Sequence, residues 1–326
     1  MMEKNKVFLT EKIHPFAVEH LSTYFEVVQG TSVKEAEIVR QAQDCEGILI
    51  RSATVTGAMM SQLPKLKVVA KHGIGVDNID VKAAAEQGIL VVNAPFSNLN
   101  AVAEHTLTML MALSKNLVHL DQKTRAGKFA ARNQYVNAEL QGKTLGLIGF
   151  GRIARMLAKK VSGFEMQVLA ADPFADAEEA KRLGAELVSQ EELLAKSDFV
   201  SLHVPLMPNT NKMVNREFLK AMKPSAVIVN ASRGPVIDEE ALTEALRSGE
   251  IKGAGLDVFD PEPPQVGNPL LELENVIVSP HNAALTDEAL LAMAMDSAQG
   301  IIDYLGGARP KYPVNQEVLP GILQMP

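Results

Sequence analysis

Residues 145–154 read LGLIGFGRIA, and this stretch decides the fold. An apolar, strand-like run is followed by a Gly-x-Gly-x-x-Ala turn, and a helical pattern begins directly after it. Gly149 permits a tight turn, and Gly151 lets the backbone approach a pyrophosphate. At the helix start, Arg152 and Ile153 would offer their backbone N–H groups and the positive end of the helix dipole. The stretch therefore predicts a dinucleotide-binding βα unit.

The strand expected at 168–171 runs into Asp172, at about the distance from the turn where such units carry an acidic residue. The Asp172 carboxylate can accept hydrogen bonds from both ribose hydroxyls and would repel a 2′-phosphate. We therefore expect NAD rather than NADP as the cofactor. The alternative is a plain glycine turn in which Asp172 caps a helix.

Short β-branched runs alternate with helical patterns along the whole chain, which indicates parallel βα units. The first series has strand candidates at 7–9, 25–28, 47–50, 68–70 and 90–92, with helices near 15–21, 33–41 and 79–87. The second has strand candidates at 145–148, 168–171, 186–188, 199–202, 227–230, 253–257 and 276–278, with helices that include 152–161 and 239–248. We therefore expect an α/β protein with two doubly wound parallel-sheet domains.

Two long helical patterns, 101–120 and 286–305, bracket the second series of strands. The last residues could therefore return to the first domain and leave the second inserted. On this hypothesis residues 1–98 plus 287–326 form one domain, and residues 99–286 form the other.

Composition is typical of a soluble globular protein and limits the classes of function. The chain has 326 residues, 47% of them hydrophobic and 22% charged, and a formal net charge of −7. Its mean hydropathy is +0.04. No basic cluster favours nucleic acid, no apolar run is long enough to cross a membrane, and the N-terminus lacks the apolar core of a signal peptide. We expect a cytoplasmic protein whose single cysteine, Cys45, is a small buried apolar residue.

Three polar motifs follow the last strands of the second series, where open parallel sheets collect ligands. His281 suits a base for a hydroxyl proton, because an imidazole titrates near neutral pH. Glu262 could hydrogen-bond its far nitrogen and stabilise the imidazolium. Arg233 has the planar fork that binds a carboxylate. Each also has an ordinary interpretation: a surface ion pair for Arg233, a solvated loop carboxylate for Glu262 and a capped loop histidine for His281.

These motifs resemble the D-isomer-specific 2-hydroxyacid dehydrogenase family over nearly the whole chain. The residues that carry the resemblance are Arg51-Ser52, Gly73–Asn78, Asn93–Asn98, Gly149–Ile153, Asn230–Gly234, Gly255–Phe259 with Glu262-Pro263, and Ser279–His281. The resemblance implies a flavodoxin-like substrate domain made from both chain ends and a central Rossmann NAD-binding domain. It also implies that Arg233, Glu262 and His281 are the catalytic residues.

The resemblance assigns further residues to ligand binding. The backbone of Ile74 and Gly75 would hold the substrate carboxylate together with Arg233. The cofactor would be lined by His203, Pro205, Thr210, Ala231 and Asp257, and Asp257 would accept from the nicotinamide carboxamide. The remaining histidines have no metal-ligand spacing, so we expect no metal: His14, His20, His72, His105 and His119.

The substrate is less well defined than the chemistry. Arg51, Lys71 and Arg132 would together bind a phosphate at the far end of the substrate; ordinary surface cations are the alternative. The family branch most similar to this sequence oxidises D-3-phosphoglycerate to 3-phosphohydroxypyruvate, the first step of serine biosynthesis. A glyoxylate/hydroxypyruvate reductase or a broad D-2-hydroxyacid dehydrogenase is the second interpretation, and an NAD-sensing protein like the co-repressors that share this fold is the third.

Two further expectations concern the size of the assembly and of the chain. The resemblance implies a homodimer with contacts through the helix at 101–120; a linker helix packed within one chain is the alternative. The resemblance is to the short form of the phosphoglycerate branch, so we expect no serine-sensing domain after Pro326.

Overall fold

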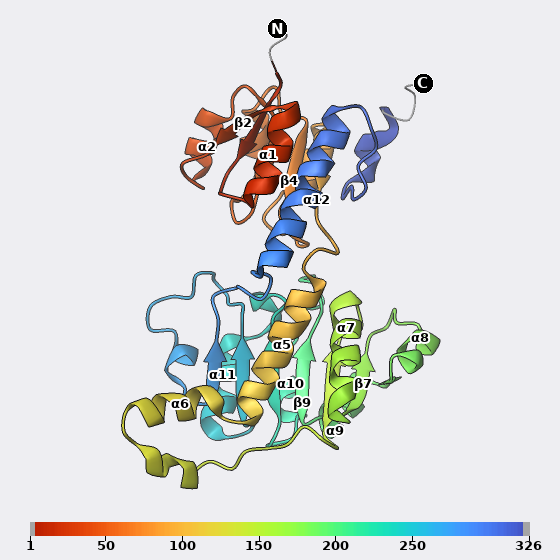
Figure 1. Cartoon of the computed structure of the whole chain (residues 1–326). Coiled ribbons are helices and arrows are strands. Elements are labelled where there is room, and N and C mark those ends of the chain that lie inside the picture. Colours follow the sequence, from red (N-terminus) through yellow and green to blue (C-terminus); the bar gives the residue numbers. More distant parts are fainter. Residues whose placement is uncertain (1–3, 322–326) are drawn as a thin grey trace. The chain divides into compact units, whose positions relative to one another are not determined.

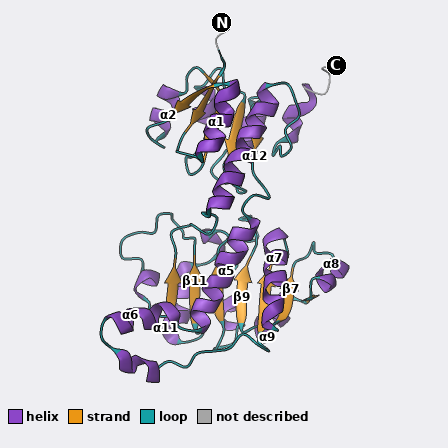
Figure 2. Cartoon of the chain, viewed as in Figure 1, coloured by secondary structure: helices purple, strands orange, loops and turns teal. Residues whose placement is uncertain are grey.

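The computed structural model describes residues 4–321, which form two compact units. Unit 1 comprises the described residues of Met1–Asn98 and Leu285–Pro326, and unit 2 comprises Leu99–Ala284. The chain therefore leaves unit 1 after Asn98 and returns to it at Leu285. Figure 1 shows this course along the chain, and Figure 2 shows helices alternating with strands in both units.

Unit 1 contains a five-stranded parallel sheet in the order β2-β1-β3-β4-β5. Its elements are β1 (Lys6–Leu9), α1 (Pro15–Tyr24), β2 (Glu26–Gln29), α2 (Glu35–Gln41), β3 (Cys45–Ile50), α3 (Gly57–Ser61), β4 (Val68–Lys71), α4 (Val81–Glu86), β5 (Leu90–Val92), α12 (Asp287–Leu305) and η5 (Gln316–Gly321). This strand order is the flavodoxin-like one.

The sheet of unit 1 is buried on both faces because its strands are apolar on both sides. One face packs against α2, α3 and α4 through Ile38, Met59 and Ala84. The other packs against α1 and α12 through Leu21 and Ile301. The last long helix is thus part of the core of the first unit.

Unit 2 contains a seven-stranded parallel sheet in the order β12-β11-β10-β9-β6-β7-β8. Its elements are α5 (Leu99–Ser114), α6 (Leu117–Arg125), η1 (Phe129–Asn133), β6 (Thr144–Ile148), α7 (Arg152–Val161), η2 (Ser162–Phe164), β7 (Gln167–Ala171), α8 (Ala177–Arg182), β8 (Ala185–Leu187), α9 (Gln190–Lys196), β9 (Phe199–Leu202), α10 (Arg216–Lys220), β10 (Val227–Asn230), η3 (Gly234–Val236), α11 (Glu239–Ser248), β11 (Gly253–Leu256), η4 (Pro269–Glu272) and β12 (Val276–Val278). This is the Rossmann order with a seventh strand at one edge.

Alternating side chains of the strands fill two cores in unit 2. Val227 and Val229 of β10 face α5, α7 and α8, whereas Ile228 faces α9, α10 and α11. Strand β6 lies in the middle of the sheet, next to β7 and β9. The turn after β6 is therefore at the topological switch point, where open sheets bind ligands.

The expected helix over 101–120 is wrong in one respect. The helical stretch begins at Leu99 and breaks after Ser114, and α6 begins at Leu117. Asn116 interrupts it with a left-handed φ of 47°, a conformation that asparagine tolerates better than most residues. Periodicity did not reveal the break because apolar residues continue on both sides of it.

One smaller expectation also differs from the structure: the second strand begins at Glu26 rather than Phe25. The helix expected at 152–161 is found with these bounds in α7. No helix in residues 4–321 combines the length and the apolar character that a bilayer span requires. Cys45 is buried in β3, and burial raises the pKa of its thiol to about 11.

Candidate active site

The glycine turn after β6 leaves room for a phosphate at the start of α7. Gly149 has a φ of 85°, and a Cβ at this position would lie 2.7 Å from the carbonyl oxygen of His203. A Cβ at Gly151 would meet only open space, and Gly151 precedes α7 as an N-cap with no side chain to cap it. The glycine turn thus leaves open space at the positive end of the α7 dipole, which fits the pyrophosphate of a dinucleotide.

The turn is held from both sides at Phe150. The Phe150 N–H donates to Oδ2 of Asp172 (2.7 Å), and the Phe150 carbonyl accepts from Nε of Arg155 (2.8 Å). Asp172 Oδ1 accepts from the N–H of Phe174 (2.8 Å). Each Asp172 oxygen keeps a lone pair, so the carboxylate can bind the turn and a ribose at the same time. The alternative in which Asp172 caps a helix is wrong: the N-cap of α7 is Gly151, without a side-chain cap, and the N-cap of α8 is Asp176.

The loop after β9 carries three of the expected cofactor residues. His203 hydrogen-bonds Ser201 through Nε2 (2.9 Å), and burial lowers the pKa of His203 to about 4. Thr210 donates to the carbonyl of Pro205 (2.6 Å) and accepts from the N–H of Met207 (2.8 Å). A pKa lowered in this way favours a neutral imidazole at neutral pH, and the structure shows a loop closed on itself beside the glycine turn.

The loop after β10 presents Arg233 on an organised backbone. The buried Asn230 side chain accepts from the N–H and the hydroxyl of Ser232 and donates to the carbonyl of Arg233 (2.8 Å). A Cβ at Gly234 would lie 1.8 Å from the carbonyl oxygen of Phe259. Only glycine fits there, and this contact brings the Arg233 loop against the segment that carries Glu262.

His281 and Glu262 form a direct pair. Nδ1 of His281 lies 2.7 Å from Oε2 of Glu262, and Oε1 of Glu262 accepts from the N–H of Phe259 (3.0 Å). Partial burial raises the pKa of Glu262, but the hydrogen bond and charge of His281, the Phe259 N–H and the charge of Arg233 outweigh it and lower the pKa overall. The carboxylate is therefore ionised at neutral pH and can stabilise an imidazolium.

The structure brings Asp257 together with two residues that sequence reasoning missed. The buried Asp257 carboxylate accepts from Ser279 Oγ (2.6 Å), and Ser279 Oγ lies 3.0 Å from Nε2 of His105. His105 is on α5, and no sequence signal links it to residues near 257 or 279. Ala231, the remaining expected cofactor residue, follows β10 directly and is partly buried.

Four further residues expected to bind the substrate lie in unit 1: Arg51, Lys71, Ile74 and Gly75. Lys71 Nζ donates to the carbonyl of Arg51 and to Oδ1 of Asn78 (2.8 Å), so this ammonium cross-links two loops. Burial and the charge of Arg51 lower the pKa of His72 to about 4. The loop through Ile74 and Gly75 follows, beyond the end of β4. The ends of β3 and β4 thus carry the cationic side chains of Arg51 and Lys71, and the Glu11 carboxylate accepts from the N–H groups of Arg51 and Ser52.

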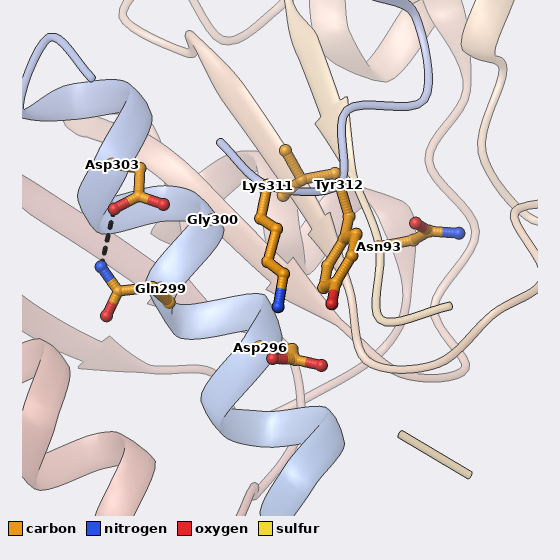
Figure 3. A pocket seen from close by; sticks show the side chains of 8 residues that line it. Asn93, Asp296, Gln299, Gly300, Asp303, Lys311 and Tyr312 are labelled. Carbon is orange, nitrogen blue, oxygen red and sulfur yellow. Dashed lines mark hydrogen bonds between the residues drawn. The ribbon is translucent and has the colours of Figure 1, made fainter. Parts of the chain in front are cut away.

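Ile74 is anchored through its carbonyl, which accepts from Nδ2 of Asn93 (2.7 Å). Asn93 also lines a cavity of about 40 Å³ in unit 1, shown in Figure 3, together with Asp296, Lys311 and Tyr312. That volume suits one or two water molecules and not a phosphorylated acid. The cavity is therefore not the substrate site.

Arg132, the third expected phosphate ligand, lies exposed on η1 of unit 2. Its guanidinium sits 5.3 Å from the centre of the Phe129 ring. Among residues 4–321, no group of three or more His, Cys, Asp or Glu side chains is arranged to hold a metal ion.

Comparison with known proteins identifies the family. The model described as D-isomer specific 2-hydroxyacid dehydrogenase, NAD binding domain, matches residues 107–283, which is more than half of the chain. The chain belongs to this family. This match confirms the family and the NAD cofactor expected from the motifs, and the two parallel sheets confirm the fold class.

Relatives and solved structures extend the likeness to both units. D-3-phosphoglycerate dehydrogenase of Methanocaldococcus jannaschii is 41% identical over 97% of this chain and 60% of its own length. The TT0316 protein of Thermus thermophilus is 35% identical, with a TM-score of 0.88 over 95% of this chain and 99% of that one. An NADPH-dependent glyoxylate/hydroxypyruvate reductase from Sinorhizobium meliloti is 29% identical, with a TM-score of 0.85 over 96% of this chain and 99% of that one. The chain spans about 60% of the length of these curated relatives.

Proposed function

We propose that this protein is an NAD-dependent oxidoreductase that acts on the CH–OH group of a small D-2-hydroxy acid. The observation that carries the proposal is the His281–Glu262 pair, 2.7 Å apart, in the same unit as the NAD-binding turn. A bound NAD⁺ would accept the hydride from the hydroxyl-bearing carbon, and NADH would return it in the reverse direction.

The protein supplies the proton chemistry. Nε2 of His281 accepts the hydroxyl proton as the substrate is oxidised, and it returns the proton when a keto acid is reduced. The ionised Glu262 stabilises the resulting imidazolium through Nδ1. Arg233 binds the substrate carboxylate and polarises the neighbouring oxygen.

Unit 1 is proposed to bind the substrate. The N–H groups of Ile74 and Gly75 would hold the carboxylate, and the positive charge of Arg51 and Lys71 would favour an anion. Domains 1–98 plus 287–326 and 99–286 then act as the substrate and cofactor domains. These boundaries lie within two residues of the two compact units.

D-3-phosphoglycerate is the proposed substrate, and its oxidation would begin serine biosynthesis. The 41% identity to the Methanocaldococcus jannaschii enzyme supports this choice. Arg51 and Arg132 would supply positive charge for the phosphate. Lys71 would act mainly by holding the Arg51 loop against Asn78. Glyoxylate or hydroxypyruvate is the second candidate, because the likeness to the Sinorhizobium meliloti reductase covers both units.

We also propose a homodimer in the cytoplasm. Large apolar side chains are exposed around α6 and η1, among them Leu117 and Phe129 at 61% and 67% and Val136 at 85%. Exposed apolar groups of this kind are typical of a protein interface. A single buried thiol needs no oxidising compartment.

A substrate panel tests the proposal. Purified protein is assayed with NAD⁺ and D-3-phosphoglycerate, and with NADH and hydroxypyruvate, glyoxylate and pyruvate. We expect 3-phosphoglycerate to have the highest kcat/KM. Efficient reduction of glyoxylate without oxidation of 3-phosphoglycerate would favour the reductase, and NADH binding without turnover of any acid would favour an NAD-sensing protein.

Two variants test the roles of the pair. His281→Ala should lower kcat about 100-fold or more and leave the Kd for NADH nearly unchanged. Glu262→Gln should move the acidic limb of the pH profile of kcat/KM for oxidation to lower pH, because the imidazolium loses its anionic partner. His20→Ala, in a partly exposed histidine of α1, is the matched control. An unchanged pH profile in Glu262→Gln would remove Glu262 from the mechanism.

A further inference from the structure

We propose that Ser279 and His105 are positioning residues for hydride transfer, acting through the carboxylate of Asp257. This inference rests on the proposed function, because it concerns the alignment of His281. It adds two residues to the site and gives Asp257 a second task besides the cofactor contact expected for it.

Asp257 is fully buried, and hydrogen bonds fix its carboxylate. Oδ1 accepts from Ser279 Oγ (2.6 Å) and from the N–H of Asn282 (2.9 Å). Oδ2 accepts from the N–H of Ala283 (3.0 Å). Such donors offset the cost of removing the carboxylate from water. Oδ2 is the oxygen with the larger remaining capacity to accept a hydrogen bond.

All of these donors belong to the segment that carries His281. The N–H of His281 itself donates to the backbone carbonyl of Asp257 (2.8 Å). His281 has a left-handed φ of 49°, which is uncommon for a residue with a side chain and persists only where the surroundings enforce it. Asp257 therefore holds the turn at His281 from both its backbone and its side chain.

Ser279 and His105 decide how the carboxylate is oriented. The terminal torsion of an aspartate is soft, so hydrogen bonds select which oxygen faces which donor. Ser279 has one hydroxyl proton, and the 2.6 Å contact assigns it to Asp257 Oδ1. The Ser279 oxygen then accepts from Nε2–H of His105 at 3.0 Å. His105 Nε2 also lies 3.6 Å from Oδ1 of Asp257, which adds to the attraction when the imidazole is protonated.

Together these hydrogen bonds form a relay that links His105 on α5, through Ser279, to Asp257 and the turn at His281. Without the Ser279 hydroxyl, Oδ1 loses its shortest partner and the carboxylate can rotate. The turn at His281 then loses its alignment, although the groups that bind the rest of the cofactor are untouched. The expected signature is a loss in kcat without a matching loss in NADH affinity.

The experiment compares Ser279→Ala, Ser279→Thr and His105→Asn with wild-type protein. We expect kcat to fall about tenfold in Ser279→Ala, as loss of a hydrogen bond to a buried charge implies, and about threefold in His105→Asn. The Kd for NADH, measured by fluorescence titration, should stay within about twofold. Ser279→Thr keeps the hydroxyl and should restore most of kcat.

Hydrogen exchange provides a readout that needs no turnover. The amides of Asn282 and Ala283 should exchange about tenfold faster in Ser279→Ala and return toward wild-type rates in Ser279→Thr. Ser248→Ala, in an exposed serine at the end of α11, is the matched control and should change neither kcat nor these amides. Thermal unfolding of each variant measures any general loss of stability.

The outcomes separate this inference from the proposed function. If wild-type protein turns over no acid, the proposed function fails, and unchanged exchange of the two amides in Ser279→Ala would overturn the relay as well. If wild-type protein is active and Ser279→Ala has normal kcat, the inference fails and the proposed function stands. Equal losses in kcat and in NADH affinity would also overturn it.

Discussion

The two units build the same kind of sheet and finish their first strand in opposite ways. In unit 1, β1 is followed by Thr10 and Glu11, and the Glu11 carboxylate reaches across to the end of β3. It accepts from the N–H groups of Arg51 (3.1 Å) and Ser52 (2.7 Å) and from the Ser52 hydroxyl. In unit 2, β6 is followed by Gly149, whose missing side chain allows contact with the backbone at the end of β9.

Both turns lie at the switch point of their sheet, so topology alone does not select the ligand. In unit 1 the backbone N–H groups that could bind an anion, those of Arg51 and Ser52, already donate to the carboxylate of Glu11. In unit 2 the glycines leave backbone N–H groups for an external phosphate. The turn after the first strand, and not the sheet that supports it, therefore decides whether the unit can bind an external phosphate.

The largest effect is expected when a side chain is added at Gly149, in the glycine turn after β6. Gly149→Ala places a Cβ at a φ of 85° and 2.7 Å from the His203 carbonyl oxygen. We expect a loss of about 2–4 kcal/mol in unfolding free energy and at least about tenfold weaker NADH binding. Urea unfolding and fluorescence titration measure the two effects.

The matched control for this substitution is Gly184→Ala. Gly184 also has a positive φ, 75°, but a Cβ there would meet nothing within 4 Å. This variant should cost about 1 kcal/mol and leave NADH binding unchanged. Equal NADH binding by Gly149→Ala and wild-type protein would break the comparison between the two turns.

A smaller effect is expected when the Glu11 carboxylate is removed from the turn after β1. Burial raises the pKa of Glu11, but hydrogen bonds from Ser52, Thr10 and Arg51 lower it overall from its ordinary value of 4.5. The carboxylate therefore stabilises the folded state above that value, and this stability is lost as pH falls through the lowered pKa. Glu11→Ala should cost about 2 kcal/mol at pH 7 and clearly less at about pH 3.

Unfolding by urea at the two pH values measures this change. Sulfate should restore more stability to Glu11→Ala than to wild-type protein, because it can occupy the emptied anion position. An identical sulfate response in the two proteins would argue against the interpretation of Glu11 as an internal anion.

The smallest expected effect concerns the choice of nucleotide. Asp172→Asn keeps an oxygen that can accept from Phe150 but removes the charge that repels a 2′-phosphate. We expect the ratio of NADPH to NADH affinity to rise about tenfold with little change in stability. Asp176→Asn, at the N-cap of α8, is the control carboxylate. An affinity ratio unchanged in Asp172→Asn would exclude Asp172 from nucleotide selection.

The sequence predicted best where a local pattern is sufficient. The helices at 152–161 and 239–248 and the strands at 199–202, 227–230 and 276–278 have the predicted bounds, because apolar period and turn residues agree there. The sequence also predicted that Arg233, Glu262 and His281 each follow a strand of the parallel sheet, and in the structure they do. Their catalytic roles stay predictions.

The rest depends on contacts between distant residues. His105 and Ser279 are 174 positions apart, so neither spacing nor periodicity indicates their hydrogen bond. The break at Asn116 depends on a single left-handed residue inside an apolar pattern. The sequence predicts Lys71 as a phosphate ligand, and only the structure shows that its ammonium ties the Arg51 carbonyl to Asn78.

The return of the chain to unit 1 has a consequence for biosynthesis. Ala294, Ala298 and Ile301 of α12 complete the apolar core that Val7, Leu49 and Val68 begin. During translation α1 can cover only part of this sheet face, and the rest stays exposed until residues 287–305 leave the ribosome. Unit 2, continuous from Leu99 to Ala284, has its entire sequence available sooner. We expect nascent chains to acquire protease resistance in the middle segment before the amino-terminal one.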